Sequence, residues 1–438
     1  MKNLNIFQII VLGVFATLII VGMLAFSGKL PFLPKSAKDV NYGTVTVWGT
    51  FPANMMQALI SDKFRNEKSV TINYVEKSKA TFSTDLVEAL AADRGPDLFL
   101  IAQDEILRNL NKIAFIPYEA FTERDFKNTF IEEGEMFFRP EGLVALPFTI
   151  DPMVMYWNRD IFTNAGIVAP PTKWSDFYPM VPKIVVRDQG GNISRGFASL
   201  GEYRNVSHAK EILSVLMMQA GSPIVGIQNG VLMSNLTSAT DPNAQNPAAQ
   251  ALNFFSQFSR SDKDSYSWNR SLPNSRSMFE AGDLALYFGY ASEYQTIKQK
   301  NPHLNFDITV MPQADQASVK MTFGRIQGFA IVKTSSNLAG AMRASLLLSG
   351  SDMAKGIAEA TKLPPVRRDL LAVRPTDPIQ SVFYDSALIA RAWHDPSPTE
   401  TDQLFQGMID DIGSDRLKVS QALSVTQSSI NKLLQRYK

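Results

Sequence analysis

The sequence predicts an α/β fold with parallel sheets, preceded by one apolar helix at the N-terminus. From residue 43 onward, short β-branched or continuously apolar segments alternate with segments in which apolar residues recur at helical spacing. This alternation is typical of parallel sheets covered by helices on both faces. Ahead of it, residues 6–26 are almost wholly apolar, and a run of roughly twenty such residues can cross a bilayer as a helix.

The N-terminal apolar run is longer than the core of a cleavable signal peptide, which has roughly 7–15 apolar residues. We therefore predict a signal-anchor, transmembrane helix within residues 1–28 and a linker over residues 29–42. The segment Ala25-Phe26-Ser27 also fits a small-x-small cleavage site, so cleavage stays open as an alternative. One lysine precedes the run and three follow it closely, a distribution that would place the following domain in the cytoplasm.

The first elements after the linker alternate between strand and helix. Residues 44–48 (T-V-T-V-W) predict a strand, Pro52 opens a helix, residues 70–75 form the next strand, residues 85–92 a helix, and residues 97–101 (D-L-F-L-I) a buried strand. Residues 234–247 are rich in turn-forming residues and predict an exposed loop before a helix over residues 248–258. Two helices are expected over residues 401–438, joined near Gly413-Ser414.

Composition excludes several kinds of site. The chain has 438 residues and no cysteine, which excludes disulfides, cysteine zinc sites, thiol nucleophiles and a lipidated cysteine. Its three histidines, His208, His303 and His394, lie far apart in sequence, so we expect no metal site and no cofactor. The net charge of +1 gives no global field that would favour nucleic acid.

The sequence contains few of the motifs that would indicate an enzyme rather than a binding protein. The segments 207–210 and 429–432 both match S-x-x-K, the nucleophile pattern of penicillin-binding enzymes. Neither is accompanied by S-D-N or K-T-G, and the chain has no G-x-S-x-G, P-loop, G-x-G-x-x-G or H-E-x-x-H motif. So loose a pattern arises easily by chance in a chain of this length, and we predict that the protein is not an enzyme.

Several segments, in order along the chain, resemble the extracellular solute-binding proteins of the maltose-binding type, which serve ABC importers. They are T-V-T-V-W-G-T (44–50), A-L-A-A-D-R-G-P-D-L-F-L-I (89–101), G-L-V-A-L-P-F-T-I-D-P-M-V-M-Y-W-N-R-D-I-F (142–162), A-G-I-V-A-P-P-T-K-W-S-D-F (165–177), M-F-E-A-G-D-L-A-L-Y-F-G-Y (278–290), G-R-I-Q-G-F-A-I-V-K-T-S-S (324–336) and K-L-P-P-V-R (362–367). Trp157 departs from the family, which usually has tyrosine there, and no lipobox cysteine follows the apolar run.

The resemblance implies a two-lobed, periplasmic-binding-protein-like (type II) fold with discontinuous lobes and a hinge. Lobe 1 is expected in residues 43–148 plus 327–366, and lobe 2 in residues 149–326 plus 370–438. The crossings should fall near residues 148–151 and 324–327, where Gly324 and Gly328 would allow unusual backbone angles. The resemblance also implies an extracytoplasmic domain. We predict that location, although the lysine distribution around the apolar run would place the domain in the cytoplasm.

The resemblance and the strand ends together suggest where a ligand binds. Gln103 and Asp104 follow a buried strand at its carboxyl end, where open α/β sheets bind ligands. Tyr290 lies where the family often presents a stacking aromatic, and Asp151 where it often places an acid. Trp268 and Trp393 are possible further platforms. The ten candidate ligand-binding residues are Trp48, Thr50, Phe51, Gln103, Asp104, Asp151, Tyr290, Arg325, Gln327 and Tyr384.

Some of these candidate residues also have a plausible structural role. Trp48 could pack beneath the cleft, Asp104 could cap the next helix, and Arg325 could pair with Asp151 across the hinge. The resemblance implies a receptor, anchored in the cell membrane, that captures a small polar solute for the permease subunits of an ABC importer. The predicted solute is a sugar or an oligosaccharide, and the receptor is expected to be a monomer. A ligand-sensing or surface-binding module without transport, and a polyamine receptor, are the alternatives.

Overall fold

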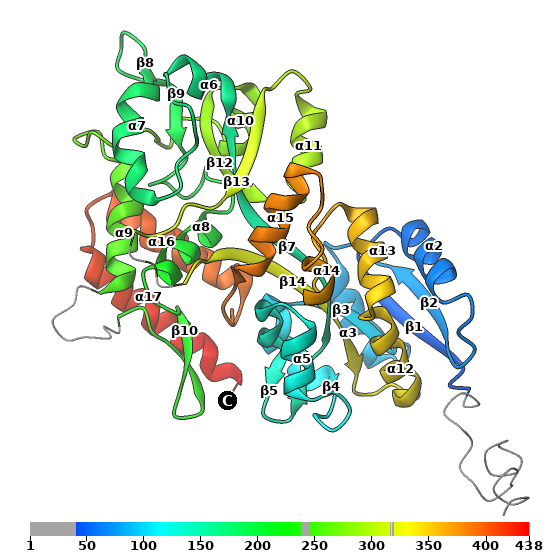
Figure 1. The fold of residues 1–438 in the computed structure, drawn as a ribbon. Coiled ribbons are helices and arrows are strands. Elements are labelled where there is room, and N and C mark those ends of the chain that lie inside the picture. The colour runs from blue at the N-terminus through cyan, green and yellow to red at the C-terminus, as the bar shows by residue number, and fades with distance from the viewer. Residues whose placement is uncertain (1–40, 238–245, 316, 318, 438) are drawn as a thin grey trace, which may run out of the picture.

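A computed structural model of the chain describes residues 41–237, 246–315, 317 and 319–437. Two α/β lobes lie side by side, joined by long strands and by helix α15 (Pro378–Leu388) between them (Figure 1). The predicted helix over residues 6–26 and most of the predicted loop over residues 234–247 lie outside the described residues. Within the described ranges, none of the helices combines the length and the apolar character that crossing a bilayer requires.

Lobe 1 is built around one sheet with helices on both faces. Its strands are β1 (Thr44–Gly49), β2 (Thr71–Glu76), β3 (Leu98–Ala102), β4 (Ile113–Ala114), β5 (Phe138–Arg139) and β6 (Gly142–Leu143). Its helices are α2 (Ala53–Lys63), α3 (Phe82–Ala91), α4 (Ile106–Asn109), α5 (Glu123–Thr129), α12 (Leu338–Leu348), α13 (Ser351–Thr361) and α14 (Arg368–Leu371), with short 3-10 turns at Gln103–Glu105, Leu110–Lys112 and Glu132–Phe137.

Lobe 2 holds the rest of the chain. Its strands are β8 (Val186–Arg187), β9 (Ile193–Ala198), β10 (Val225–Gln228), β11 (Val231–Ser234), β12 (Leu284–Tyr290) and β13 (Phe306–Val310). Its helices are α6 (Arg159–Asn164), α7 (Phe177–Ile184), α8 (Ala209–Gln219), α9 (Pro247–Ser256), α10 (Ser275–Ala281), α11 (Glu293–Lys300), α16 (Pro398–Gly413) and α17 (Val419–Leu434), with 3-10 turns at Trp174–Asp176, Gln257–Ser259 and Gln435–Tyr437.

Two long strands, β7 (Leu146–Asn158) and β14 (Thr322–Val332), run through both lobes. The strand order is β2-β1-β3-β14-β7-β12-β9-β8, with β13 on β7, and with β4 and β15 (Ala390–Arg391) on β14. β1 is parallel to β2 and β3, and β9 is parallel to β12, as predicted. The sheet is mixed rather than parallel throughout, because β7 and β14 are antiparallel to each other and to β3, β4, β12 and β13, while β14 is parallel to β15.

The core divides where these two strands cross. Buried residues 146, 148 and 150 of β7 and 326 and 329–332 of β14 belong to the lobe 1 core, whereas residues 153–156 and 323 belong to the lobe 2 core. At the crossing the strands pair antiparallel, with Ile150 opposite Ile326 and Pro152 opposite Gly324. The two lobes are therefore joined by a paired two-stranded ribbon.

The glycines of the crossing strand have a different role from the one predicted. Neither Gly324 nor Gly328 has a positive φ, so neither supplies an unusual backbone angle. A Cβ at Gly324 would collide with the Glu133 carboxylate and lie 2.8 Å from Cβ of Ala390, and one at Gly328 would lie 2.5 Å from the Leu146 carbonyl oxygen. Glycine is needed at both positions because other segments pack directly against the strand.

Candidate functional site

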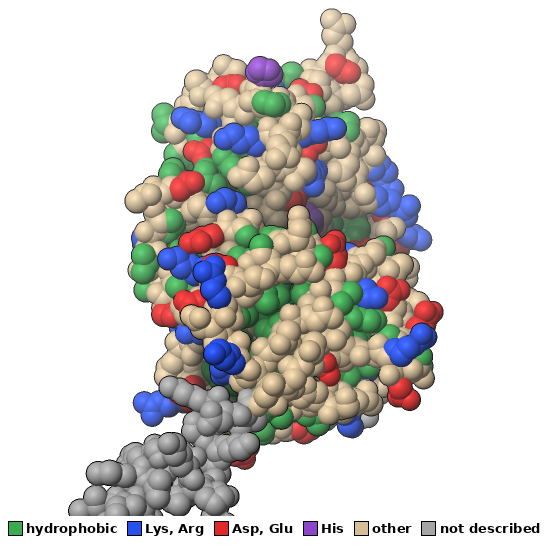
Figure 2. Space-filling view, turned by 90° about the vertical axis from the view of Figure 1, so that its right-hand side faces the viewer, with side chains coloured by type: hydrophobic (Ala, Val, Ile, Leu, Met, Phe, Trp, Pro, Cys, Tyr) green, Lys and Arg blue, Asp and Glu red, His purple; other side chains and the backbone are tan. Residues whose placement is uncertain are grey.

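A small cavity lies between the lobes, and Figure 2 shows the surface hollowed between the upper and lower parts of the molecule. The cavity measures about 20 Å³, enough for roughly one water molecule. A solute of several rings therefore requires the lobes or the lining side chains to move apart. The lining residues are Gln103, Asp104, Lys210, Glu211, Tyr290, Phe323, Arg325, Trp393 and Asp395.

Lobe 1 contributes Gln103 and Asp104, which follow the carboxyl end of β3. The Gln103 side chain is 2 % exposed, and its Nε2 donates a hydrogen bond of 3.3 Å to the Gly324 carbonyl oxygen on the crossing strand. Its Oε1 is buried and has no hydrogen-bond partner among the described residues. Because a buried acceptor without a partner costs free energy, this amide is suited to receive a donor from a ligand.

Lobe 2 contributes Tyr290 at the end of β12. Its main chain is fixed, because its carbonyl oxygen accepts from the Tyr156 hydroxyl at 2.6 Å and its N–H donates to Glu293 Oε1 at 3.0 Å. The side chain is 2 % exposed, and its hydroxyl has no partner within the described residues. Burial raises the pKa of this hydroxyl well above its usual value, so the group is neutral and can both donate and accept.

Arg325 projects into the cavity from the crossing strand. Its guanidinium carbon lies 4.4 Å from the centroid of the Tyr290 ring, within cation–π range. Its Nη2 is 3.9 Å from Glu211 Oε1, a loose ion pair at the first turn of α8. Asp104 faces the same space, and no hydrogen bond or ion pair joins it to another described residue.

The remaining lobe 2 residues are held by bonds within their own lobe. Lys210 Nζ lies 2.9 Å from Asp395 Oδ2 and also donates to the Pro398 carbonyl oxygen at 3.1 Å. Asp395 is 3 % exposed and accepts from the Thr401 hydroxyl at 2.8 Å. Burial raises the pKa of Asp395, which the Lys210 charge opposes. Trp393 donates from Nε1 to Ser214 Oγ at 3.0 Å and packs on the Phe405 ring.

The structure brings four of the ten predicted ligand-binding residues into this cavity, namely Gln103, Asp104, Tyr290 and Arg325, together with Trp393. Trp48, Thr50, Phe51, Asp151, Gln327 and Tyr384 do not line it. Trp268 is fully buried in lobe 2, where its Nε1 donates to Asn205 Oδ1 at 3.1 Å.

The six predicted residues outside the cavity have structural contacts. Trp48 is 8 % exposed beneath Lys77, whose Nζ lies 3.8 Å from the ring centroid, and Phe51 packs edge-on against Phe148. Tyr384 packs against the lobe 1 core, and Gln327 accepts a long hydrogen bond of 3.4 Å from the Thr149 hydroxyl; Thr50 differs from these residues in that it is only partly buried after β1.

Asp151 lies opposite Arg325 in the β7–β14 ladder, yet its carboxylate accepts from the Ser292 N–H at 3.0 Å. Burial raises the pKa of Asp151 to about 6. The group therefore connects the crossing ribbon to the start of α11. A role in ligand binding for Asp151 stays a prediction.

Four lining residues, Lys210, Glu211, Phe323 and Asp395, were not predicted. Phe323 could have been found, because it lies two positions before Arg325 and alternate strand residues share a face. In the sequence, Lys210 stands out only as the last residue of the S-x-x-K pattern over residues 207–210. Nothing local in the sequence indicates that the start of α8 meets the segment after β15, since that contact joins residues far apart in the chain.

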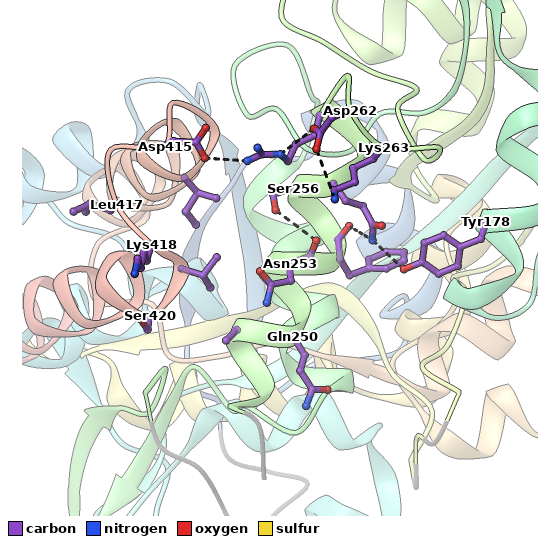
Figure 3. Close-up of a pocket in the computed structure, with 16 residues that line it drawn as sticks. Tyr178, Gln250, Asn253, Ser256, Asp262, Lys263, Asp415, Leu417, Lys418 and Ser420 are labelled. Carbon is purple, nitrogen blue, oxygen red and sulfur yellow. Dashed lines mark hydrogen bonds and ion pairs between the residues drawn. The ribbon is translucent and has the colours of Figure 1, made fainter. Parts of the chain in front are cut away.

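A larger hollow of about 990 Å³ lies on the outer side of lobe 2, between α9 and the turn that joins α16 to α17 (Figure 3). Its lining mixes polar and apolar side chains; Gln257 Nε2 donates to the Tyr178 hydroxyl at 2.9 Å and Arg260 pairs with Asp415 at 3.0 Å. All its residues belong to lobe 2. A ligand there would not contact both lobes, so the cavity between the lobes is the better candidate site.

No group of three or more His, Asp or Glu side chains in the described part of the chain is arranged to hold a metal ion. The interlobe cavity offers hydroxyl, amide, carboxylate, ammonium and guanidinium groups beside three aromatic side chains, Tyr290, Phe323 and Trp393.

Solved structures with the same fold are bacterial solute-binding proteins. The cyclic α-maltosyl-1,6-maltose binding protein from Arthrobacter globiformis matches with a TM-score of 0.74 and 16% identity, over 90% of this chain and 99% of that chain. The sugar-binding protein MalE from Xanthomonas citri matches with a TM-score of 0.72 and 15% identity, over 90% and 98%. At these identities the likeness shows the two-lobed fold alone.

Sequence comparison agrees with the fold. A protein of Brucella abortus named as a binding protein is 26% identical over 119 residues, which are 26% of this chain and 28% of that protein. The match therefore spans little more than a quarter of that relative's length. The model of the bacterial extracellular solute-binding protein family matches residues 53–344, about two thirds of the chain. This confirms the predicted resemblance and the prediction of a binding protein rather than an enzyme: the chain belongs to the family of bacterial extracellular solute-binding proteins.

Proposed function

We propose that this protein is a receptor for a small saccharide, which it captures between its two lobes and delivers to an ABC importer. One observation carries the proposal. Gln103 Oε1 on lobe 1 and the Tyr290 hydroxyl on lobe 2 are both buried, both without a partner within the described residues, and both face one cavity. A sugar hydroxyl both donates and accepts, so it can satisfy the two groups at once.

The rest of the cavity suits the same ligand class. Carboxylates such as Asp104 and Glu211 accept hydrogen bonds from hydroxyl groups, and Arg325 donates to ring and hydroxyl oxygens. Phe323 and Trp393 line the cavity and can contact the apolar C–H face of a sugar, whereas Arg325 covers a face of the Tyr290 ring. Relatives of the same fold are described with maltotetraose and with cycloalternan bound. These descriptions support a saccharide here as well.

Capture would work by closure of the lobes. The residues facing the cavity come from both lobes and from the ribbon between them, so a ligand gains all its contacts only when the lobes approach. Hinge closure around a ligand is well established for periplasmic binding proteins. Closure then follows from the higher affinity of the closed form for the ligand, and the importer permease would recognise that closed surface.

The remaining predictions belong to the same proposal. The lobes would be bounded near the predicted limits, residues 43–148 plus 327–366 for lobe 1 and residues 149–326 plus 370–438 for lobe 2, with α14, whose Leu371 packs in the lobe 1 core, assigned to lobe 1. A helix within residues 1–28 would tether a monomeric receptor to the outer face of the cell membrane. A role in ligand binding for Trp48, Thr50, Phe51, Asp151, Gln327 and Tyr384 stays a prediction.

Thermal unfolding of the full-length chain against a panel of saccharides tests the proposal. A ligand present at about 100 times its Kd adds roughly 2.7 kcal/mol to the folded state, which raises Tm by a few degrees at most in a chain of this size. Tyr290→Phe removes only the unpartnered hydroxyl and should reduce the shift. Tyr178→Phe makes the same change in the outer hollow of lobe 2 and should not.

A saccharide shift that survives Tyr290→Phe and Gln103→Ala unchanged would place the site elsewhere. The absence of a shift with any saccharide, together with a shift caused by a polyamine such as spermidine, would replace the sugar by a cationic solute.

A further inference from the structure

The charges in the interlobe cavity do not balance. Three carboxylates, Asp104, Glu211 and Asp395, face two cations, Lys210 and Arg325. Lys210 and Asp395 form a close pair of 2.9 Å, which leaves Arg325 as the cation nearest to both remaining carboxylates. Arg325 approaches Glu211 only to 3.9 Å. The cavity therefore keeps an excess of one negative charge.

The neighbouring charged groups do not supply the missing cation. Glu105 beside Asp104 has Arg108 at 3.7 Å, so these two charges offset each other, and Lys79, the other cation that acts on Glu105, does not line the cavity. His208, next to Lys210 along the chain, is bonded to Glu293 at 2.6 Å, and Arg276 lies 3.5 Å from the same carboxylate. These pairs lie outside the cavity lining, so the charge of Asp104 is left for a ligand.

The surface over Tyr290 already holds a cation. Arg325 stacks on the ring face at 4.4 Å, with Glu211 beside it. Because Arg325 occupies that face, a ligand cation would bind beside the ring, where the Asp104 carboxylate has no hydrogen bond or ion pair with the described residues. The unpartnered Gln103 Oε1 adds an acceptor suited to an N–H donor. The cavity thus combines groups that bind hydroxyls with groups that favour positive charge.

Resting on the proposed function, we propose that the preferred ligand is a saccharide with a positively charged amino group, held between Asp104 of lobe 1 and Glu211 of lobe 2. Closing the lobes removes water from both carboxylates, which is costly unless charge or hydrogen bonds replace it. A neutral hydroxyl group offers the carboxylates a hydrogen bond only, whereas an ammonium group offers them a hydrogen bond and a positive charge. An amino sugar should therefore bind about tenfold more tightly than the matching neutral sugar.

Matched pairs of ligands test this preference in the full-length chain. Glucose with glucosamine and galactose with galactosamine each differ only by a hydroxyl or a protonated amine at C2, and cellotriose differs in the same way at C2 of every ring from the fully deacetylated chitosan trimer. Calorimetric titration at mildly acidic pH should give a lower Kd for the amino member of at least one pair. Added salt should reduce that difference, because it screens the charge.

Variants locate the preference. Asp104→Asn and Glu211→Gln should each bring the ratio of the two Kd values toward one, whatever they do to overall affinity. Asp262→Asn, a charge removed in the outer hollow of lobe 2, should leave the ratio unchanged. Equal or tighter binding of the neutral members would overturn the amino-sugar inference while the saccharide receptor stands. Failure of every ligand in the panel to bind would remove both.

Discussion

The two lobes differ in how they treat the polar groups that they place near the cleft. Lobe 2 satisfies most of them internally: Lys210 with Asp395, Trp393 with Ser214, and the Tyr290 main chain with Tyr156 and Glu293. Lobe 1 leaves Gln103 Oε1, the Asp104 carboxylate and both oxygens of Glu133 without partners in the described residues. Lobe 2 is therefore a largely preorganised half-site with one unpartnered group, the Tyr290 hydroxyl, whereas lobe 1 contributes several polar groups without partners in the described residues.

The largest effect is expected where lobe 2 is most tightly paired. Lys210→Met keeps the apolar stem and removes the charge, which leaves Asp395 as a buried carboxylate without its cation. Breaking one side of a buried pair costs about 3–5 kcal/mol. Chemical denaturation should show a loss of that size. Arg436→Met in the exposed pair with Glu400 is the control and should change little. Equal small losses would mean that the lobe 2 pair is not structural.

A smaller effect concerns the unpaired carboxyl of lobe 1. Glu133 is 2 % exposed, and burial raises its pKa to about 8 from an ordinary 4.5. The folded state therefore holds this proton more tightly than the unfolded chain does. The stability that Glu133 contributes is fully present below pH about 4.5 and is lost as pH rises through about 8.

The free energy of unfolding, measured by chemical denaturation at pH values between about 4.5 and 8, should accordingly fall as pH rises, by a few kcal/mol at most. Glu133→Gln should flatten this dependence because it removes the titrating group. The adjacent Glu132→Gln should leave it unchanged, since Glu132 is exposed beside Arg391. A slope that Glu133→Gln does not alter would assign the pH dependence to other groups, of which Asp151, with a pKa of about 6, is the first candidate.

The smallest change in stability is expected at Gln103. Gln103→Met removes an acceptor without a partner and one long hydrogen bond, so the free energy of unfolding should change by no more than about 1 kcal/mol. Saccharide binding should nevertheless fall, as measured by the thermal shift. A large loss of stability would instead make Gln103 a structural link between β3 and the crossing strand.

Local patterns in the sequence were enough to predict several of the helices and strands. The strand over residues 44–48 appears as β1, the helix over residues 248–258 as α9 with its 3-10 end, and the C-terminal helix pair as α16 and α17. Such patterns depend on spacing within one segment. The antiparallel course of β7 and β14 was missed because strand direction depends on partners far away in the chain.

The same limit explains the site. Gln103 and Tyr290 follow strands that could be recognised, and strand ends gather at one edge of a sheet. Lys210 and Asp395 meet only because α8 and the segment after β15 pack together, which no short motif encodes. Trp48 has the composition of a sugar platform, yet Lys77 covers its ring, a contact that depends on the pairing of β1 with β2.

The paired crossing of β7 and β14 also bears on how such receptors diversify. Pro152 and Gly324 are neighbours in the ladder, so residues 153–323 leave lobe 1 and return to it at adjacent points. In topological terms this stretch is an insertion with its two ends side by side. A recombination event that exchanged it would need only two joints, both in regular strand, provided that α16 and α17, which pack on it, changed with it. New specificities could then arise by exchange of half a binding site at a time.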